Sequence, residues 1–251
     1  MDFTGKVAIA TGAASGMGLL FSQKFAELGG NVVMVDINKE VLEASAAAIN
    51  EKGQGKALAT VCDVRDYQQV CAVRDAAVET FGRIDLMLNF AGGTARRVLK
   101  VAKELEFPDI PIEVFDWGID VNMRAQFYFD HAVMKVMREQ QSGLIINIGS
   151  ITGVEGDSTG MDYPTAKSGV MNGLTTSLAQ YGSKYGVRCV CVSPGPVLTR
   201  PGMANMKTLV GRAAEPIEII DFILFIASDK GQFINGTNLM IDGGRSAMKR
   251  S

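Results

Sequence analysis

The stretch YPTAK, residues 163 to 167, places a tyrosine and a lysine four positions apart. A proline is tolerated only in the first turn of a helix, so Pro164 puts Tyr163 at a helix start. Residues four apart lie on one face of a helix, so the phenol can lie near the ammonium of Lys167. A neighbouring cation and a helix N-terminus both favour the phenolate over the phenol. The spacing therefore predicts a group that exchanges protons with a substrate.

A second group of residues has the pattern of a dinucleotide site. In TGAASGMG, Gly12, Gly16 and Gly18 follow an apolar run and permit a tight turn whose backbone N–H groups face a pyrophosphate. Asp36 ends the next apolar run, where a carboxylate accepts both ribose hydroxyls and repels a 2′-phosphate. NAD is therefore favoured over NADP, although the nearby Lys39 weakens this preference. The alternatives are a turn without a ligand and an aspartate that only caps the following helix.

The elements that must position these residues follow from the apolar pattern. Seven short runs rich in β-branched and aliphatic residues predict strands, and helix-length segments separate most of them. Nearly continuous apolar strands indicate a parallel sheet covered on both faces, which is a doubly wound, Rossmann-like α/β fold. No linker interrupts the chain, so one domain is expected over residues 1–251. The predicted strands are 6–11, 31–36, 57–62, 84–89, 143–149, 187–193 and 237–242, and the predicted helices are 18–28, 39–52, 67–81, 112–141 and 165–185.

Ligands of such a fold bind beyond the carboxyl ends of the strands, where Ser150 follows the fifth predicted strand. With this residue, an ordered set of motifs resembles the single-domain short-chain dehydrogenase/reductase family over nearly the whole chain. The motifs are TGAASGMG at 11–18, Asp36, CDV at 62–64, NFAG at 89–92, Asn122, Ser150, Tyr163 with Lys167, and SPGPVLT at 193–199.

The resemblance implies hydride transfer between a nicotinamide and a secondary alcohol or ketone. It implies that Tyr163 exchanges the proton and that Ser150 holds the substrate oxygen. Lys167 is expected to lower the pKa of Tyr163 and to bind the nicotinamide ribose, while Asn122 holds a water that passes protons to solvent. Taken singly, each of these residues also fits an ordinary structural role. The implied cofactor contacts are Gly12, Ser15, Gly16, Met17, Gly18, Asp36, Ile37, Asp63, Val64, Asn89, Ala91, Gly92, Tyr163, Lys167, Pro194, Gly195, Val197 and Thr199.

Three features depart from the family's usual pattern. Phe90 stands in NFAG where a polar amide is common. Segment 200–212 is shorter than the usual substrate lid, so closure over a substrate is either less complete or relies on an inserted segment. That insertion is 93–121, which is longer than the usual connection. Its basic residues either contact an acidic substrate or form a solvated helix face, and we favour the solvated face. They are Arg96, Arg97, Lys100 and Lys103.

Composition limits the other classes of function. The net charge of −2 gives no basic footprint for nucleic acid, and no apolar window is long enough to span a bilayer, so a cytoplasmic protein is expected. His131 is the only histidine, so no zinc site built on imidazoles and no other metal is expected. Ser150 lacks the G-x-S-x-G frame of an α/β hydrolase. The four cysteines are not spaced C-x-x-C and are expected to be buried free thiols.

The sequence leaves the substrate open. Polyols, sugars, hydroxy acids, 3-oxoacyl thioesters and hydroxysteroids are all compatible, and a polyol-like or hydroxy-acid substrate is favoured because no arginine patch for an acyl carrier is evident. A dinucleotide-binding protein without catalytic activity is a further alternative, against which the complete polar set argues. Family members commonly assemble through the helix after YPTAK, so a homotetramer or homodimer is expected. Small residues on this helix permit close approach of a partner helix: Ala166, Gly169, Gly173 and Ser177.

Overall fold

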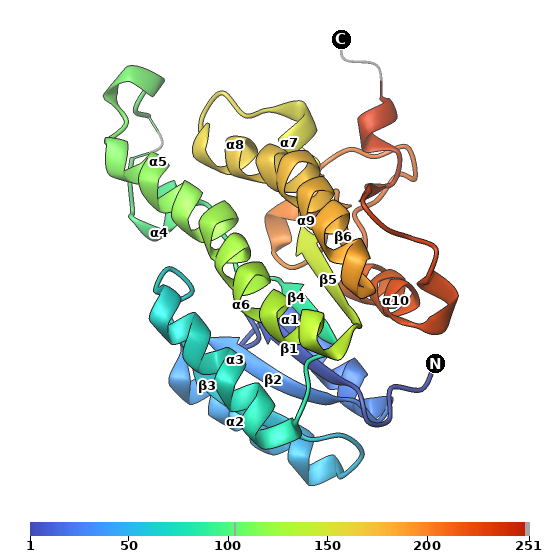
Figure 1. The fold of residues 1–251 in the computed structure, drawn as a ribbon. Coiled ribbons are helices and arrows are strands. Elements are labelled where there is room, and N and C mark those ends of the chain that lie inside the picture. Colours follow the sequence, from blue (N-terminus) through green and yellow to red (C-terminus); the bar gives the residue numbers. More distant parts are fainter. Residues whose placement is uncertain (103, 249–251) are drawn as a thin grey trace.

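The computed structural model describes residues 1–102 and 104–248. They form one parallel sheet of seven strands with helices packed on it (Figure 1). The strand order is β3-β2-β1-β4-β5-β6-β7, which confirms the predicted doubly wound fold. Chain order reverses between β1 and β4, and ligands of such sheets bind beside this reversal. The strands are β1 (Val7–Thr11), β2 (Asn31–Asp36), β3 (Ala57–Val61), β4 (Leu86–Asn89), β5 (Gly143–Ile148), β6 (Val187–Pro194) and β7 (Asn238–Ile241).

The helices confirm the predicted pattern with one omission. Helices α2 (Lys39–Lys52) and α3 (Tyr67–Phe81) have the predicted bounds, and α1 is Gly16–Glu27. Helix α10 (Pro216–Ala227) is not among the predicted helices. It packs beside α1 with Ile219, Ile220, Ile223 and Leu224 buried, and its exposed face is marked by few polar residues, among them Asp221.

Two long helical regions are interrupted by π turns, whose hydrogen bonds span five residues. One region comprises α5 (Ile112–Ile119), the π turn η2 (Asp120–Arg124) and α6 (Ala125–Gln140). The other comprises α8 (Asp162–Gly169), the π turn η3 (Val170–Leu174), α9 (Thr175–Gly182) and η4 (Ser183–Tyr185). Such turns are frequent at functional sites, and here η2 contains Asn122.

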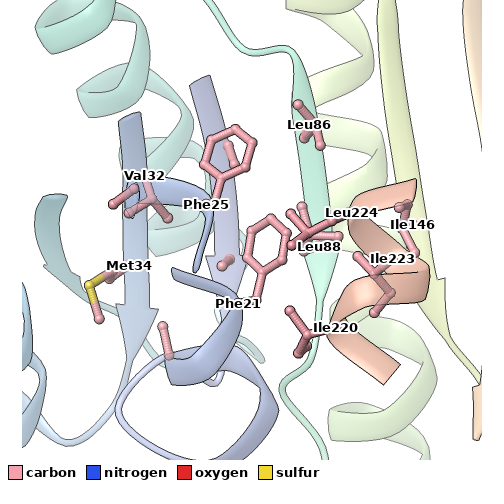
Figure 2. Packing of buried hydrophobic residues seen from close by; sticks show 14 of the residues in the cluster. Phe21, Phe25, Val32, Met34, Leu86, Leu88, Ile146, Ile220, Ile223 and Leu224 are labelled. Atoms are coloured by element: carbon pink, nitrogen blue, oxygen red, sulfur yellow. The ribbon is translucent and has the colours of Figure 1, made fainter. Parts of the chain in front are cut away.

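Aromatic packing fills one face of the sheet, which α1, α2 and α10 cover. Phe21 and Phe25 of α1 are fully buried between the sheet and the apolar side chains of α10, as Figure 2 shows. Phe90 packs against Phe21 with ring centroids 5.7 Å apart. The unusual phenylalanine of NFAG therefore extends this core, while α3, α6 and α9 cover the opposite face.

Short elements follow the carboxyl ends of the strands. The inserted segment contains α4 (Ala95–Val98) and η1 (Phe107–Asp109), and α7 (Thr152–Glu155) lies between β5 and α8. In Figure 1 the loops around α5 and α8 project from the same end of the molecule. Three 3-10 turns complete the chain: η5 (Pro201–Asn205), η6 (Asp229–Gly231) and η7 (Arg245–Ala247).

The cysteines and the helix after YPTAK differ in part from expectation. Cys71 is half-buried, whereas the other three free thiols are buried as expected. The small size of Gly169 makes room for another residue of the same chain, because a Cβ there would lie 2.9 Å from Met123 Sδ. Gly173 and Ser177 are exposed. Across residues 1–102 and 104–248, no helix combines the length and apolar character needed to cross a membrane.

Candidate active site

The glycine turn between β1 and α1 is fixed by backbone packing. A Cβ on Gly18 would lie 2.4 Å from Gly12 O, and one on Gly12, whose φ is +65°, would lie 3.0 Å from Ala91 N. Ser15 precedes α1 without a side-chain cap, and the first turn of the helix carries no acid. Its N–H groups and positive helix end are therefore suited to a pyrophosphate, so the turn fits a dinucleotide.

Asp36 lies at the end of β2 beside this turn. Its carboxylate accepts the backbone N–H groups of Ala14 at 3.1 Å and of Asn38 at 3.0 Å. Asn38, not Asp36, caps α2 by accepting the N–H of Val41. The alternative that Asp36 serves as the cap of this helix is therefore wrong. The nearby Lys39 pairs with Glu43 along α2.

Two predicted adenine contacts follow β2 and β3. Ile37 is 67% exposed, which is unusual for a large apolar residue and leaves its side chain available to a ligand. Asp63 is paired with Arg65, whose hydrogen bond lowers the pKa of this carboxyl against the effect of burial. The contact predicted for Val64 stays a prediction.

Asn89 lies in a buried polar network and not in an open groove. Its Nδ2 donates to Asp130 Oδ1 at 2.7 Å and to Asn147 Oδ1 at 2.8 Å, and Asn147 Nδ2 donates to Asp130 Oδ2 at 3.0 Å. Burial raises the pKa of Asp130 to about 7, although both asparagines act in the opposite direction. The side chain of Asn89 thus ties β4 and β5 to α6, and only its backbone remains for the predicted cofactor contact.

Gly92 brings this strand end close to the polar residues of the site. A Cβ on Gly92 would lie 2.8 Å from Asn122 Oδ1 and 3.7 Å from Lys167 Nζ. Asn122 accepts the N–H of Gly93 at 2.9 Å and donates to the carbonyls of Gly93 and Gly118 at 2.9 Å. Its side chain therefore fastens the start of the inserted segment to the π turn, and the predicted water contact stays a prediction.

Ser150, Tyr163 and Lys167 come together beyond β5. Tyr163 is the second residue of α8, as the proline predicts, and it lies close enough to Ser150 for that hydroxyl to lower the pKa of the phenol. Lys167 is 3% exposed; its Nζ donates to Ile148 O at 2.8 Å and lies 5.5 Å from the centroid of the Tyr163 ring. Ser150 Oγ also accepts the N–H of Thr152 at 3.2 Å.

Burial dominates the electrostatics of this group. It raises the pKa of Tyr163, while the hydrogen bond with Ser150 and the charge of Arg200 act in the opposite direction. Burial also lowers the pKa of Lys167 to about 8. The net direction for Tyr163 is opposite to the one expected from the sequence. The Lys167 ammonium lies over the Tyr163 ring and donates to the Ile148 carbonyl. Its charge therefore does not outweigh the effect of burial on the pKa of the phenol.

The segment SPGPVLT follows β6 at the same sheet edge. Pro194 O accepts the N–H of Ile151 at 2.9 Å, and Gly195 N donates to Ile241 O at 3.0 Å. A side chain on Gly195 would collide with Asp242, since a Cβ would lie 2.7 Å from its Cα. This turn is thus held between the ends of β5 and β7. Val197 is buried and Thr199 is exposed.

The basic residues of the insertion do not form one solvated face. Arg96 is half-buried, and its guanidinium donates to backbone carbonyls, including Thr159 O at 2.6 Å. Arg97 is exposed, and its side chain makes no hydrogen bond or ion pair within the described part of the chain, as expected for a solvated side chain. The expectation is therefore wrong for Arg96. Lys103 lies outside the described residues.

Arg245, near the C-terminus, was missed by the sequence analysis. It donates to Glu155 Oε2 at 3.1 and 3.2 Å and to Lys207 O at 3.0 Å. It thereby joins α7, the 200–212 segment and the C-terminal segment. No motif signals this role, because one partner is a backbone carbonyl that any residue supplies.

The described residues contain no group of three histidine, cysteine or acidic side chains that could hold a metal ion. Instead, the glycine turn and the Ser150, Tyr163 and Lys167 group lie at one edge of a doubly wound sheet. This arrangement defines an α/β protein of the dinucleotide-binding class with a serine, a tyrosine and a lysine at the ligand edge.

Comparisons with known proteins agree with this class. The short chain dehydrogenase family model matches residues 6–209. Trans-4-hydroxycyclohexanecarboxylate dehydrogenase of Sinomonas cyclohexanicum is 37% identical, over 96% of this chain and 93% of that protein. Levodione reductase of Leifsonia aquatica is 34% identical, over 98% of this chain and 96% of that protein.

Two solved structures are similar in fold. A crystal structure of levodione reductase has a TM-score of 0.88 at 33% identity and covers 98% of this chain and 100% of that one. L-sorbose reductase from Gluconobacter frateurii, solved with NADPH and L-sorbose, has a TM-score of 0.87 at 24% identity, with 99% of each chain covered. The chain belongs to the short-chain dehydrogenase family, as its motifs indicate, and is an oxidoreductase of secondary alcohols and ketones that uses a nicotinamide dinucleotide.

Proposed function

We propose that the protein transfers hydride between NAD(H) and a secondary alcohol or ketone through Tyr163, Ser150, Lys167 and Asn122. The observation that carries this proposal is the convergence of Tyr163 and Ser150 at the sheet edge, with the buried Lys167 Nζ 5.5 Å from the centroid of the Tyr163 ring. Whether residues 1–251 act as a single catalytic domain is part of the same proposal.

The protein's own residues handle the substrate oxygen and its proton. In oxidation, the Tyr163 oxygen takes the hydroxyl proton of the alcohol; in reduction it returns a proton to the carbonyl oxygen. The Ser150 hydroxyl donates a hydrogen bond to that oxygen, which stabilises charge as it develops. The nicotinamide, when bound, accepts or supplies the hydride. The site's closeness to Gly92 supports Lys167 as the residue that holds the adjoining ribose.

Asp36 supports NAD as the preferred dinucleotide. Its carboxylate lies beside the glycine turn, is already oriented by two backbone N–H groups, and has no basic side chain paired with it in the described residues. A 2′-phosphate there would meet a negative charge, whereas ribose hydroxyls would donate to it. Lys39, the residue that weakened this preference, is drawn toward Glu43.

The substrate we propose is a small polyol-like, cyclic or hydroxy-acid secondary alcohol. One relative is named for a cyclohexane ring that bears a hydroxyl and a carboxylate. A 3-oxoacyl thioester or a hydroxysteroid is the alternative within the same chemistry. We also place the protein in the cytoplasm. We further propose a homotetramer or homodimer, because Gly173 of η3 and Ser177 of α9 are exposed and leave room for a partner helix. A monomeric mass in solution would overturn this assembly.

The test is NAD reduction with a panel of neutral secondary alcohols by wild type, Tyr163→Phe and the control Tyr181→Phe, whose side chain is exposed on α9. Loss of the proton-exchanging group should lower kcat of Tyr163→Phe by about 10²- to 10⁴-fold. NADH binding, followed by fluorescence, should stay within about 3-fold for both variants, a change below ~1 kcal/mol. Undiminished turnover by Tyr163→Phe would sink the proposal, as would a protein that binds NADH and oxidises no alcohol.

A further inference from the structure

The seam between α4 and residues 159–162, which lead into and begin α8, contains two polar side chains that the proposed chemistry does not use. Arg96 belongs to the inserted segment, and Asp162 immediately precedes Tyr163. Among the described residues, the two buried side-chain polar atoms without a hydrogen-bond partner are Arg96 Nε and Asp162 Oδ2. Such atoms are unfavourable, so another requirement must keep both residues in this seam.

Arg96 joins segments that are far apart in the sequence. Its Nη1 donates to Thr159 O at 2.6 Å, three residues before Asp162. Its Nη2 donates to Leu105 O at 3.1 Å and also to Ala102 O, within the insertion itself. A guanidinium presents several N–H donors in a fixed plane, so one side chain can hold carbonyls from both segments in one geometry. Both Nη groups of the guanidinium are therefore engaged by backbone carbonyls.

Asp162 strengthens the same seam from the opposite side. Burial raises the pKa of Asp162. The backbone N–H groups of Tyr163 and Ala95 lie near its carboxylate and act to lower this pKa. Asp162 also packs tightly on α5, because a Cβ on Gly118 would lie 2.1 Å from Asp162 Oδ2. Contacts thus run both ways across the seam between α4 and residues 159–162: Arg96 to Thr159 and Asp162 to Ala95.

We propose that Arg96 and Asp162 are positioning residues for Tyr163, because they fasten the inserted segment to the residues that lead into α8. The insertion then forms a fixed wall on the substrate side. This selects one of the two alternatives left by the short 200–212 segment, namely that the site relies on the insertion. The inference rests on the proposed function, since it acts through Tyr163.

The first test compares kcat, KM and the dinucleotide Kd of Arg96→Ala, Arg96→Lys and Arg97→Ala with a neutral alcohol. A displacement of about 1 Å at a reacting group lowers rates by about 10²-fold, so Arg96→Ala should lose about 10- to 100-fold in kcat. Arg96→Lys should fall between it and wild type, because an ammonium replaces only part of the planar fork. The adjacent, unpartnered Arg97→Ala should stay within about 2-fold, and no variant should change dinucleotide binding.

The second test does not depend on turnover. Hydrogen exchange of residues 156–163, followed by mass spectrometry without ligand, should increase in Arg96→Ala and stay unchanged in Arg97→Ala. If Arg96→Ala does not fold, Gly118→Ala, which displaces Asp162, should show the increase in exchange and the loss of kcat, and Arg96→Lys should show both to a smaller extent.

The outcomes separate the inference from the proposed function. An active Tyr163→Phe variant would overturn the proposed function itself. A different result would overturn only the positioning role. In that case Tyr163→Phe is inactive, while Arg96→Ala and Arg97→Ala show the same kcat and the same hydrogen exchange. An increase in KM at unchanged kcat in Arg96→Ala would also contradict it, because that result identifies a substrate contact.

Discussion

The cofactor side and the substrate side of the sheet edge are held in different ways. On the cofactor side, Gly12 and Gly18 leave room for backbone atoms that a Cβ would strike. On the substrate side, Arg96 and Arg245 reach across to carbonyls of distant segments. The first arrangement depends on residue types that no other residue replaces at those positions. The second depends on which segments lie side by side, so the two sides should respond differently to substitution.

Gly18→Ala should have the largest effect and act on the cofactor side. The added Cβ would lie 2.4 Å from Gly12 O and 2.9 Å from Thr11 O, and backbone atoms yield poorly. We expect NADH to bind about 10- to 100-fold more weakly and the free energy of unfolding to fall by about 1 to 3 kcal/mol. Fluorescence titration and denaturant unfolding measure both. Gly202→Ala, which meets no atom within 4 Å on the substrate side, is the control; equal losses in both variants would contradict the comparison.

Asp36→Asn should change dinucleotide preference without disturbing the substrate side. The amide keeps an acceptor for one backbone N–H group but loses the charge that opposes a 2′-phosphate. We expect the ratio of kcat/KM with NAD to that with NADP to fall about 10-fold, or ~1.4 kcal/mol. Glu40→Gln, at an exposed position of α2, should leave this ratio unchanged. A ratio that does not move in Asp36→Asn would argue against the NAD assignment.

Arg245→Gln should act on the substrate side alone. It removes the pairing with Glu155 and the bond to Lys207 O, which together tie α7 to the 200–212 segment. A partly exposed ion pair contributes at most about 1 kcal/mol, so KM for the alcohol should rise by about 5-fold. Steady-state kinetics at saturating NAD checks this. NADH binding should not change, and Arg74→Gln on α3 should have no effect on either quantity.

Asp130→Asn should have the smallest effect on turnover and a clear effect on the pH dependence of stability. Burial raises the pKa of Asp130 from 3.8 to about 7. Between these values the folded chain keeps a proton that the unfolded chain has released. The free energy of unfolding therefore falls as pH rises toward about 7 and then levels off. The variant should lose this slope, on the order of a few kcal/mol, in denaturant unfolding at about pH 5 and pH 8. Equal slopes would refute the assignment.

The strand pattern and the glycine turn could be predicted because local physics determines them. Apolar runs gave all seven strands, and the helix-length segments between them gave the bounds of α2 and α3. Helix α10 was not found this way, because its mostly apolar sequence has few polar residues to mark a surface face. Tyr163 and Lys167 were predictable from their spacing and the proline between them.

The electrostatics and the fastening of the substrate side could not be predicted. The pKa of Tyr163 depends on how deeply the fold buries it, which spacing does not encode. Arg96 and Arg245 hold backbone carbonyls, which carry no residue signature, so their partners appear only when distant segments are placed together. The same holds for Asn89, whose side chain belongs to a buried network with Asp130.

A crystal structure with NADH and a slowly reduced ketone tests the central claim most directly. We expect the Tyr163 hydroxyl and Ser150 Oγ both within about 3 Å of the ketone oxygen, the reach that proton transfer requires. The nicotinamide ring should lie against the carbonyl carbon, with Lys167 at its ribose. A ketone bound with its oxygen away from Tyr163, or a Tyr163 hydroxyl turned out of reach of Ser150, would contradict the account.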